Sequence, residues 1–168
     1  MSYLLPPVAH RSFKTAAVAG IAIAILSVAQ SASDACALLT AAEISAAVGQ
    51  TVSAGQTSVS GDGTVACSYG YGSLNQFGVE IWQAPSAAEA QKKLAHDLQE
   101  SRNQSSHKTT EESGVGEGAF AWTMELGTMR MVTLSAVHGP RFLRIGAISD
   151  HAVPLDRLRA LMLKALSR

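Results

Sequence analysis

The sequence predicts an α+β domain, with three helices and an antiparallel sheet of about five strands in the order α-β-β-α-β-β-β-α. Two helix-capping motifs, an apolar stripe near the C-terminus and runs of alternating apolar and polar residues carry this prediction. The strands come in runs and do not alternate one for one with helices. This order favours antiparallel pairing, with the helices on one face of the sheet.

Three helices are expected. Residues 40–43 (TAAE) and 86–89 (SAAE) fit the capping box, in which a hydroxyl and a carboxylate satisfy free backbone N–H groups at a helix start. Gly49 ends the first helix, and the second runs over residues 87–101. The third begins at Pro154 and carries an apolar stripe of Leu155, Leu158, Leu161, Met162, Ala165 and Leu166.

Between the helices the apolar period changes to two, which indicates strands. These are expected at residues 65–69, 77–82, 119–125, 129–137 and 141–148. Turn residues at 126–127 and 138–140 join the last three strands as antiparallel neighbours. Residues 50–64, rich in Ser, Gly and Thr, are expected to form a loop or a poor edge strand, and the polar residues 101–113 a second long loop.

The first 33 residues have the three parts of a secretory signal peptide. Arg11 and Lys14 precede an apolar run of about 14 residues, which passes into small residues at 30–33. A transmembrane helix needs about 20 apolar residues, so we expect cleavage and no stable membrane span afterwards. The remaining single domain, residues 34–168, is then periplasmic or extracellular. Asp34 breaks the lipidation pattern ahead of Cys36, which argues against a lipoprotein.

Two cysteines, Cys36 and Cys67, remain in the exported domain. Exported thiols generally pair, and a bridge here would close a loop of about 32 residues, worth roughly 3–4 kcal/mol. No basic residue flanks either cysteine, which argues against a reactive thiol. We therefore predict a Cys36–Cys67 disulfide.

The charge balance restricts the class of partner. The full chain has 13 basic and 13 acidic residues, and removal of residues 1–33 leaves a net charge of −2. Without a basic stripe, nucleic acid is not expected as a partner. The glycines of residues 114–118 precede a strand rather than a helix, so we interpret them as a turn and not as a phosphate cradle. No cofactor is expected.

Three short motifs are spread over the exported domain: residues 36–40 (CALLT), 67–69 (CSY) and 114–120 (GVGEGAF). They resemble the C-x-L-L-T, C-x-[YF] and G-x-G-[DE]-x-A-[FYW] landmarks of small exported bacterial domains of unknown function, many of which are actinobacterial lipoproteins. The resemblance implies an α+β fold and a paired Cys36–Cys67, and it brings no catalytic residues. The chain departs from the lipoproteins because it lacks their lipidation box.

Candidate chemistry is sparse. A hydrolase would need His138 and His151 to converge with Asp150, and no Gly-x-Ser-x-Gly motif accompanies them. His96 and Glu100 are four apart on one helix face and could share an ion, but catalytic zinc needs three protein ligands, which makes this pair a weak case. Thioethers suit Cu(I), which makes three methionines weak candidates for a copper site: Met124, Met129 and Met131.

Four aromatic residues, Tyr69, Tyr71, Trp82 and Trp122, would mark a binding surface if they cluster on an uncovered sheet face. The hypothesis from sequence is an exported, non-enzymatic accessory domain that binds an envelope protein or a small ligand. An exported hydrolase and a methionine-based periplasmic copper-binding protein are the two alternatives.

Overall fold

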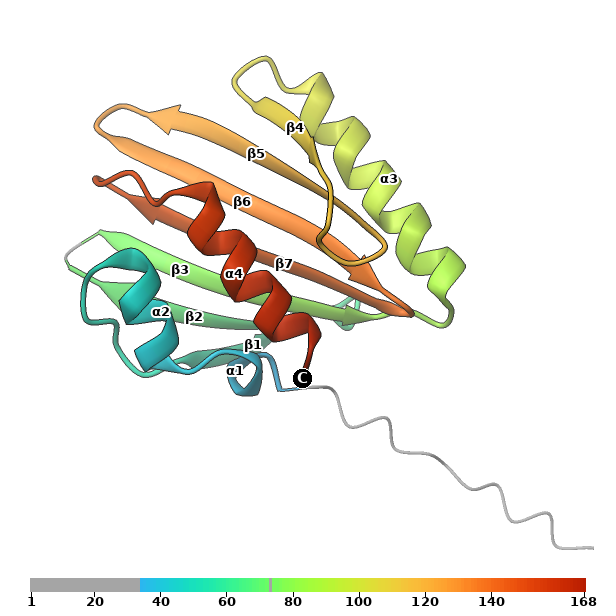
Figure 1. Ribbon diagram of the computed structural model, residues 1–168, viewed down its shortest axis with the longest axis horizontal. Helices are drawn as coiled ribbons and strands as arrows, with labels where there is room; N and C mark the ends of the chain where they lie inside the picture. Colours follow the sequence, from blue (N-terminus) through green and yellow to red (C-terminus); the bar gives the residue numbers. More distant parts are fainter. Residues whose placement is uncertain (1–33, 73) are drawn as a thin grey trace, which may run out of the picture.

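The computed structural model describes residues 34–72 and 74–168, and the predicted signal peptide lies outside them (Figure 1). Four helices and seven strands lie within this part of the chain. In order they are α1 (Ala35–Leu38), α2 (Ala41–Val48), β1 (Gln56–Val59), β2 (Val65–Tyr71), β3 (Asn75–Gln83), α3 (Ala87–Asn103), β4 (Lys108–Glu112), β5 (Gly118–Leu126), β6 (Met129–His138), β7 (Arg141–Ser149) and α4 (Leu155–Leu166).

All seven strands form one antiparallel sheet in the order β1-β2-β3-β7-β6-β5-β4. The predicted α+β class and antiparallel pairing are confirmed, but the predicted numbers of about five strands and three helices were too low. The two additional strands, β1 and β4, are the edges of the sheet, and their side chains are mostly exposed. Strand β1 confirms the poor edge strand expected as one alternative within residues 50–64, whereas β4 lies in residues expected to form a loop. The missed helix, α1, is a single turn capped by the Asp34 side chain.

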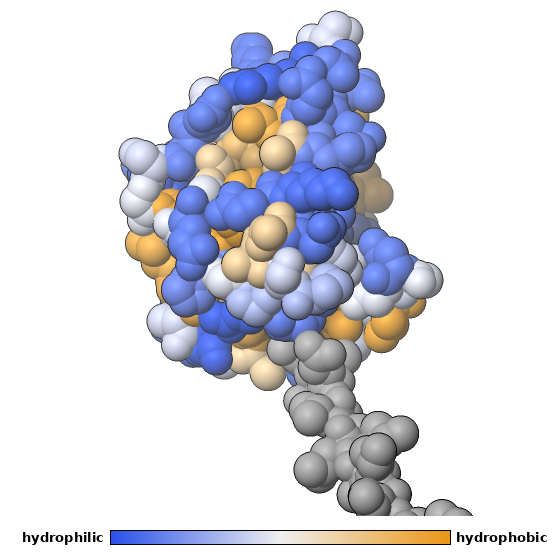
Figure 2. Space-filling model, turned by 90° about the vertical axis from the view of Figure 1, so that its right-hand side faces the viewer, coloured by the Kyte–Doolittle hydropathy of each residue, from blue (hydrophilic) through white to orange (hydrophobic). Residues whose placement is uncertain are grey.

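The helices lie on both faces of the sheet, so the expectation of helices on one face was wrong. Helices α1, α2 and α4 cover one face, which is turned toward the viewer in Figure 1. Helix α3 packs on the other face through Ala90 and Leu94, against Phe120 and Phe142. The strands β5, β6 and β7 carry apolar side chains at successive positions, so each of their faces needs cover. On the face shown in Figure 2, hydrophilic side chains surround smaller apolar areas.

The predicted disulfide is present and joins α1 to β2. Cys36 and Cys67 have their Cα atoms 5.1 Å apart, and Cys67 is fully buried. The Tyr69 hydroxyl donates a hydrogen bond to the Leu39 carbonyl oxygen at 2.7 Å, which holds the residue after α1 against the same strand. Burial raises the pKa of Tyr69 above its ordinary value, as expected for a hydroxyl in the core.

The Glu43 carboxylate joins the start of α2 to the end of the chain. It accepts hydrogen bonds from Arg168 at 2.7 Å and from the backbone N–H of Thr40 at 2.8 Å, and it lies 2.5 Å from the Lys164 ammonium. Mainly because of Arg168 and Lys164, the pKa of Glu43 falls from 4.5 to about 2. The capping box predicted at residues 40–43 is therefore present and carries an additional ion-pair network.

We expect the free energy of unfolding to depend on pH in the acid range because of Glu43. The carboxyl has its ordinary pKa in the unfolded chain, so the unfolded state binds more protons between pH 4.5 and pH 2. The contribution of the ionised Glu43 carboxylate to the free energy of unfolding is complete above pH 4.5 and is lost as the pH falls toward 2. Because the group is near the surface, it is worth about 1–2 kcal/mol. Urea unfolding of Glu43→Gln across this range should show a shallower pH dependence, whereas Glu125→Gln, at an exposed ion pair, should match the wild type.

Candidate binding groove

A groove of about 310 Å³ crosses the α3 face of the sheet where α3 does not cover it. Its floor is one cross-strand row, because the register places Ser68 opposite Gly78, Gly78 opposite Gly146, and Gly146 opposite Thr133. Trp122 follows in the same row, opposite Thr133, and closes one end. The floor therefore consists of small residues from four adjacent strands, with a half-buried indole at its β5 end.

The two long sides of the groove differ in chemistry. On one side Ile148 lies between Gln76 and Met131 in the next cross-strand row, which makes this side largely apolar. On the other side Glu80 lies opposite Arg144, which makes that side charged. A bound molecule would meet an apolar side, a flat floor and a pair of opposite charges.

Glycine occupies the two floor positions, 78 and 146, for different physical reasons. A Cβ atom at Gly146 would lie 3.0 Å from Thr133 Oγ1, so this glycine is explained by the packing of its neighbour. A Cβ atom at Gly78 would meet no heavy atom within 4 Å. Glycine weakens the interior of a strand and often marks a place where another molecule approaches the backbone closely. Gly78 therefore contributes open space above the sheet.

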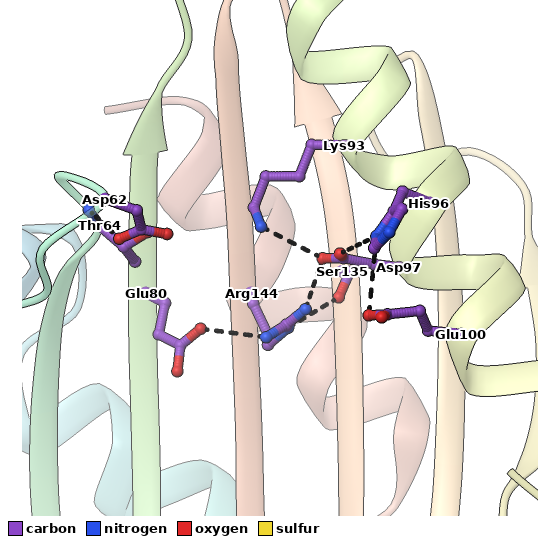
Figure 3. Close-up of polar contacts among 9 residues, drawn as sticks. All are labelled: Asp62, Thr64, Glu80, Lys93, His96, Asp97, Glu100, Ser135 and Arg144. Carbon is purple, nitrogen blue, oxygen red and sulfur yellow. Dashed lines mark hydrogen bonds and ion pairs between the residues drawn. The ribbon is translucent and has the colours of Figure 1, made fainter.

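Arg144 is the centre of a polar cluster that fixes α3 to the sheet (Figure 3). Its Nη2 donates to Asp97 at 2.6 Å, its Nη1 to Glu80 at 3.4 Å and its Nε to the Ser135 hydroxyl at 3.3 Å. Asp97 is also 3.7 Å from Lys93, and its side chain is only 9% exposed. These contacts hold the guanidinium at the meeting point of the groove and two adjoining hollows of about 290 and 170 Å³.

The side chain of Trp122 is fixed from behind. Its ring stacks on the His107 imidazole, with centroids 4.2 Å apart and planes 5° from parallel. His107 Nδ1 is in turn 3.2 Å from the Ser101 hydroxyl at the C-terminal end of α3. The indole is thus held in position between the groove and the adjoining 290 Å³ hollow.

The four aromatic residues proposed from sequence do not form one surface. Tyr69 and Tyr71 are buried on the other face, because they share the strand parity of Cys67. Trp82 and Trp122 are both half-buried on the α3 face, but Trp82 packs beneath α3, with the Lys93 ammonium 5.8 Å from its ring centroid. Only Trp122 lines the groove.

The residues proposed for a hydrolase do not converge. Asp150 and His151 are in contact, at 2.6 Å, and Asn75 donates to Asp150 at 2.8 Å. His138, however, pairs with Arg141 at the opposite end of the β6–β7 ladder. At about 3.3 Å per residue, the length of β7 puts His138 roughly 26 Å from His151. It lies instead beside Glu117, at 3.6 Å.

The candidate metal ligands are partly brought together. Met124 and Met131 are direct cross-strand partners, and Met129 follows on the same face of β6. The copper hypothesis stays a prediction. On α3, Asp97 supplies a third donor beside His96 and Glu100, and their ligand atoms lie within 4.8 Å of one another. Arg144 and Lys93 already neutralise Asp97 and would repel a metal ion there.

Neither a protein-family model, a curated protein nor a solved structure matches this chain. The fold and the groove therefore define its class, which is an antiparallel α+β domain with one disulfide and an open sheet-face groove. The resemblance to small exported bacterial domains stays a prediction. None of the helices in the described part of the chain is long and apolar enough to cross a membrane.

Proposed function

We propose that this chain is an exported, non-enzymatic accessory domain that binds a small ligand in the groove on the α3 face. The observation that carries the proposal is Gly78, a mid-strand glycine at which a Cβ atom would meet no heavy atom of the described structure within 4 Å. The groove volume lies at the lower end of the range for small-molecule sites.

The polar groups around the groove are suited to binding. Arg144 only donates hydrogen bonds and is held in place by three partners. The lining offers the Ser68 and Thr133 hydroxyls, but within the described residues it pairs neither of them with a histidine base. Export is consistent with the Cys36–Cys67 disulfide, because such bonds persist in oxidising compartments.

A fragment screen read by ¹H–¹⁵N correlation spectra tests the location of the site without knowledge of the natural ligand. We expect fragment-induced shifts to cluster at the Gly78 and Gly146 amides and the Trp122 indole. Gly78→Leu fills the open space and should abolish these shifts, and because its Cβ meets no atom, the fold should be retained. Gly61→Leu is the matched control, because a Cβ atom there also meets nothing within 4 Å.

Two outcomes of the screen would contradict the proposal. In one, fragments collect elsewhere, for example in the hollow between α2 and α4 that Ala46, Ala160 and Leu161 line. In the other, Gly78→Leu leaves the shifts at Gly146 and Trp122 unchanged. A loss of the shifts in Gly61→Leu as well would show that the effect is not specific to the groove.

A further inference from the structure

The geometry points to a ligand class for this groove: a free α-amino acid with an apolar side chain, bound as a zwitterion. This inference rests on the proposed binding function. The ligand carboxylate would bind Arg144, its ammonium group would bind Glu80, and its side chain would lie against Ile148 and Met131.

Arg144 is held in a fixed position and has unused hydrogen-bond donors. A guanidinium carries five N–H donors, and Arg144 uses three of them on Asp97, Glu80 and Ser135. One N–H on each terminal nitrogen remains. The side chain is 32% exposed, and its guanidinium carbon lies 5.5 Å from the Phe142 ring centroid, so one face is supported by the core. A carboxylate would therefore meet a guanidinium that needs little reorganisation.

The Glu80 carboxylate, next to Arg144, can accept further hydrogen bonds. Its carboxylate accepts one long hydrogen bond, of 3.4 Å from Arg144, and is 39% exposed. Its Oε1 atom accepts no hydrogen bond from any described residue. Arg144 is bound much more closely by Asp97, so Glu80 is the more loosely held member of the pair. An ammonium group at Glu80 would satisfy the free oxygen.

The spacing of the two charges selects the class of ligand. Glu80 and Arg144 are direct cross-strand partners, and their charged groups are adjacent. In an α-amino acid the carboxylate and the ammonium group are attached to the same carbon and are also adjacent. A purely anionic ligand would be repelled by Glu80, and a purely cationic one by Arg144. The apolar residues Ile148 and Met131 lie on the opposite side of the floor, where an apolar side chain would be buried.

Isothermal titration of the disulfide-bonded domain with L-leucine and L-phenylalanine tests the inference. We expect binding of both, weakened about tenfold or more by N-acetylation, which removes the ammonium charge, and likewise by conversion of the carboxylate to an amide. Glu80→Gln should weaken the binding of L-leucine by a similar factor but should not weaken that of N-acetyl-L-leucine, which has no ammonium group and which the Glu80 carboxylate repels. Glu125→Gln is the matched control, because Glu125 pairs with Arg130 outside the groove.

The outcomes separate this inference from the proposed function. If neither amino acid binds at millimolar concentration while fragments still shift the Gly78 and Gly146 amides, the ligand class is wrong and the groove remains a binding site. If nothing binds the groove, both are wrong. Equal affinity for L-leucine and its N-acetyl derivative, or equal effects of Glu80→Gln and Glu125→Gln, would also overturn the assignment of the ammonium group to Glu80.

Discussion

Replacing Cys36 and Cys67 together by alanine should lower the free energy of unfolding by about 3–4 kcal/mol, the entropic effect of opening a loop of this size. The loss should be centred on α1. This helix has a single turn, and a helix this short does not form on its own. Without the bond, only packing and hydrogen bonds such as that from Tyr69 to the Leu39 carbonyl oxygen would keep Ala35 and Leu38 buried.

Urea unfolding of the double variant and of the wild type, each with and without reductant, measures this effect. Reduced wild type and the double variant should unfold at similar midpoints, and reductant should not change the variant. Gly55→Ala is an informative partner, because a Cβ atom there would lie 2.5 Å from Cys67 Sγ, 2.9 Å from the Tyr69 ring and 3.0 Å from Cys36 Sγ, and the substitution should therefore also lower the free energy of unfolding. A loss below about 1 kcal/mol in the double variant would show that the packing of α1 does not depend on the bond.

The elements that could be predicted from sequence are those specified by local chemistry. The capping box at Thr40 is present in full, and at Ser86 the N-cap half of the predicted box is present, because these hydrogen bonds join residues three apart. The edge strand β4 could not be recognised in the same way, and β1 was expected only as an alternative to a loop. Their side chains are mostly polar and mostly exposed, and what makes them strands is backbone pairing with β2 and β5. That pairing leaves no periodic pattern in the sequence.

The groove depends on register, which a single sequence does not reveal. Gly78 and Gly146 become neighbours only because β7 inserts beside β3, and Arg144 meets Asp97 only because α3 packs on that face. One signal was readable, since Gly78 interrupts an otherwise regular strand. The aromatic prediction failed for a different reason. Tyr69 and Tyr71 have the same parity as Cys67, whose bond to α1 places all three on the covered face.

Gly116→Ala is expected to destabilise the domain by about 3–5 kcal/mol. Residues 114–117 form the predicted turn before β5, and Gly116 has φ of +61°, a region that costs an L-residue about 1–2 kcal/mol. A Cβ atom there would also lie 2.2 Å from the Val137 carbonyl oxygen. That oxygen accepts a 2.8 Å hydrogen bond from the Glu117 backbone N–H, so it cannot move away without breaking the link between the turn and β6.

Gly114→Ala separates the cost of the positive φ angle from the cost of the close approach to Val137. Gly114 has φ of +74°, but a Cβ atom at this position meets nothing within 4 Å, so only the conformational cost of about 1–2 kcal/mol should remain. Thermal and urea unfolding of both variants should therefore show a clearly larger loss at Gly116. Equal losses at the two positions would mean that the end of β6 yields to the added methyl group. In that case the glycine would be required for its backbone conformation and not for its close approach to Val137.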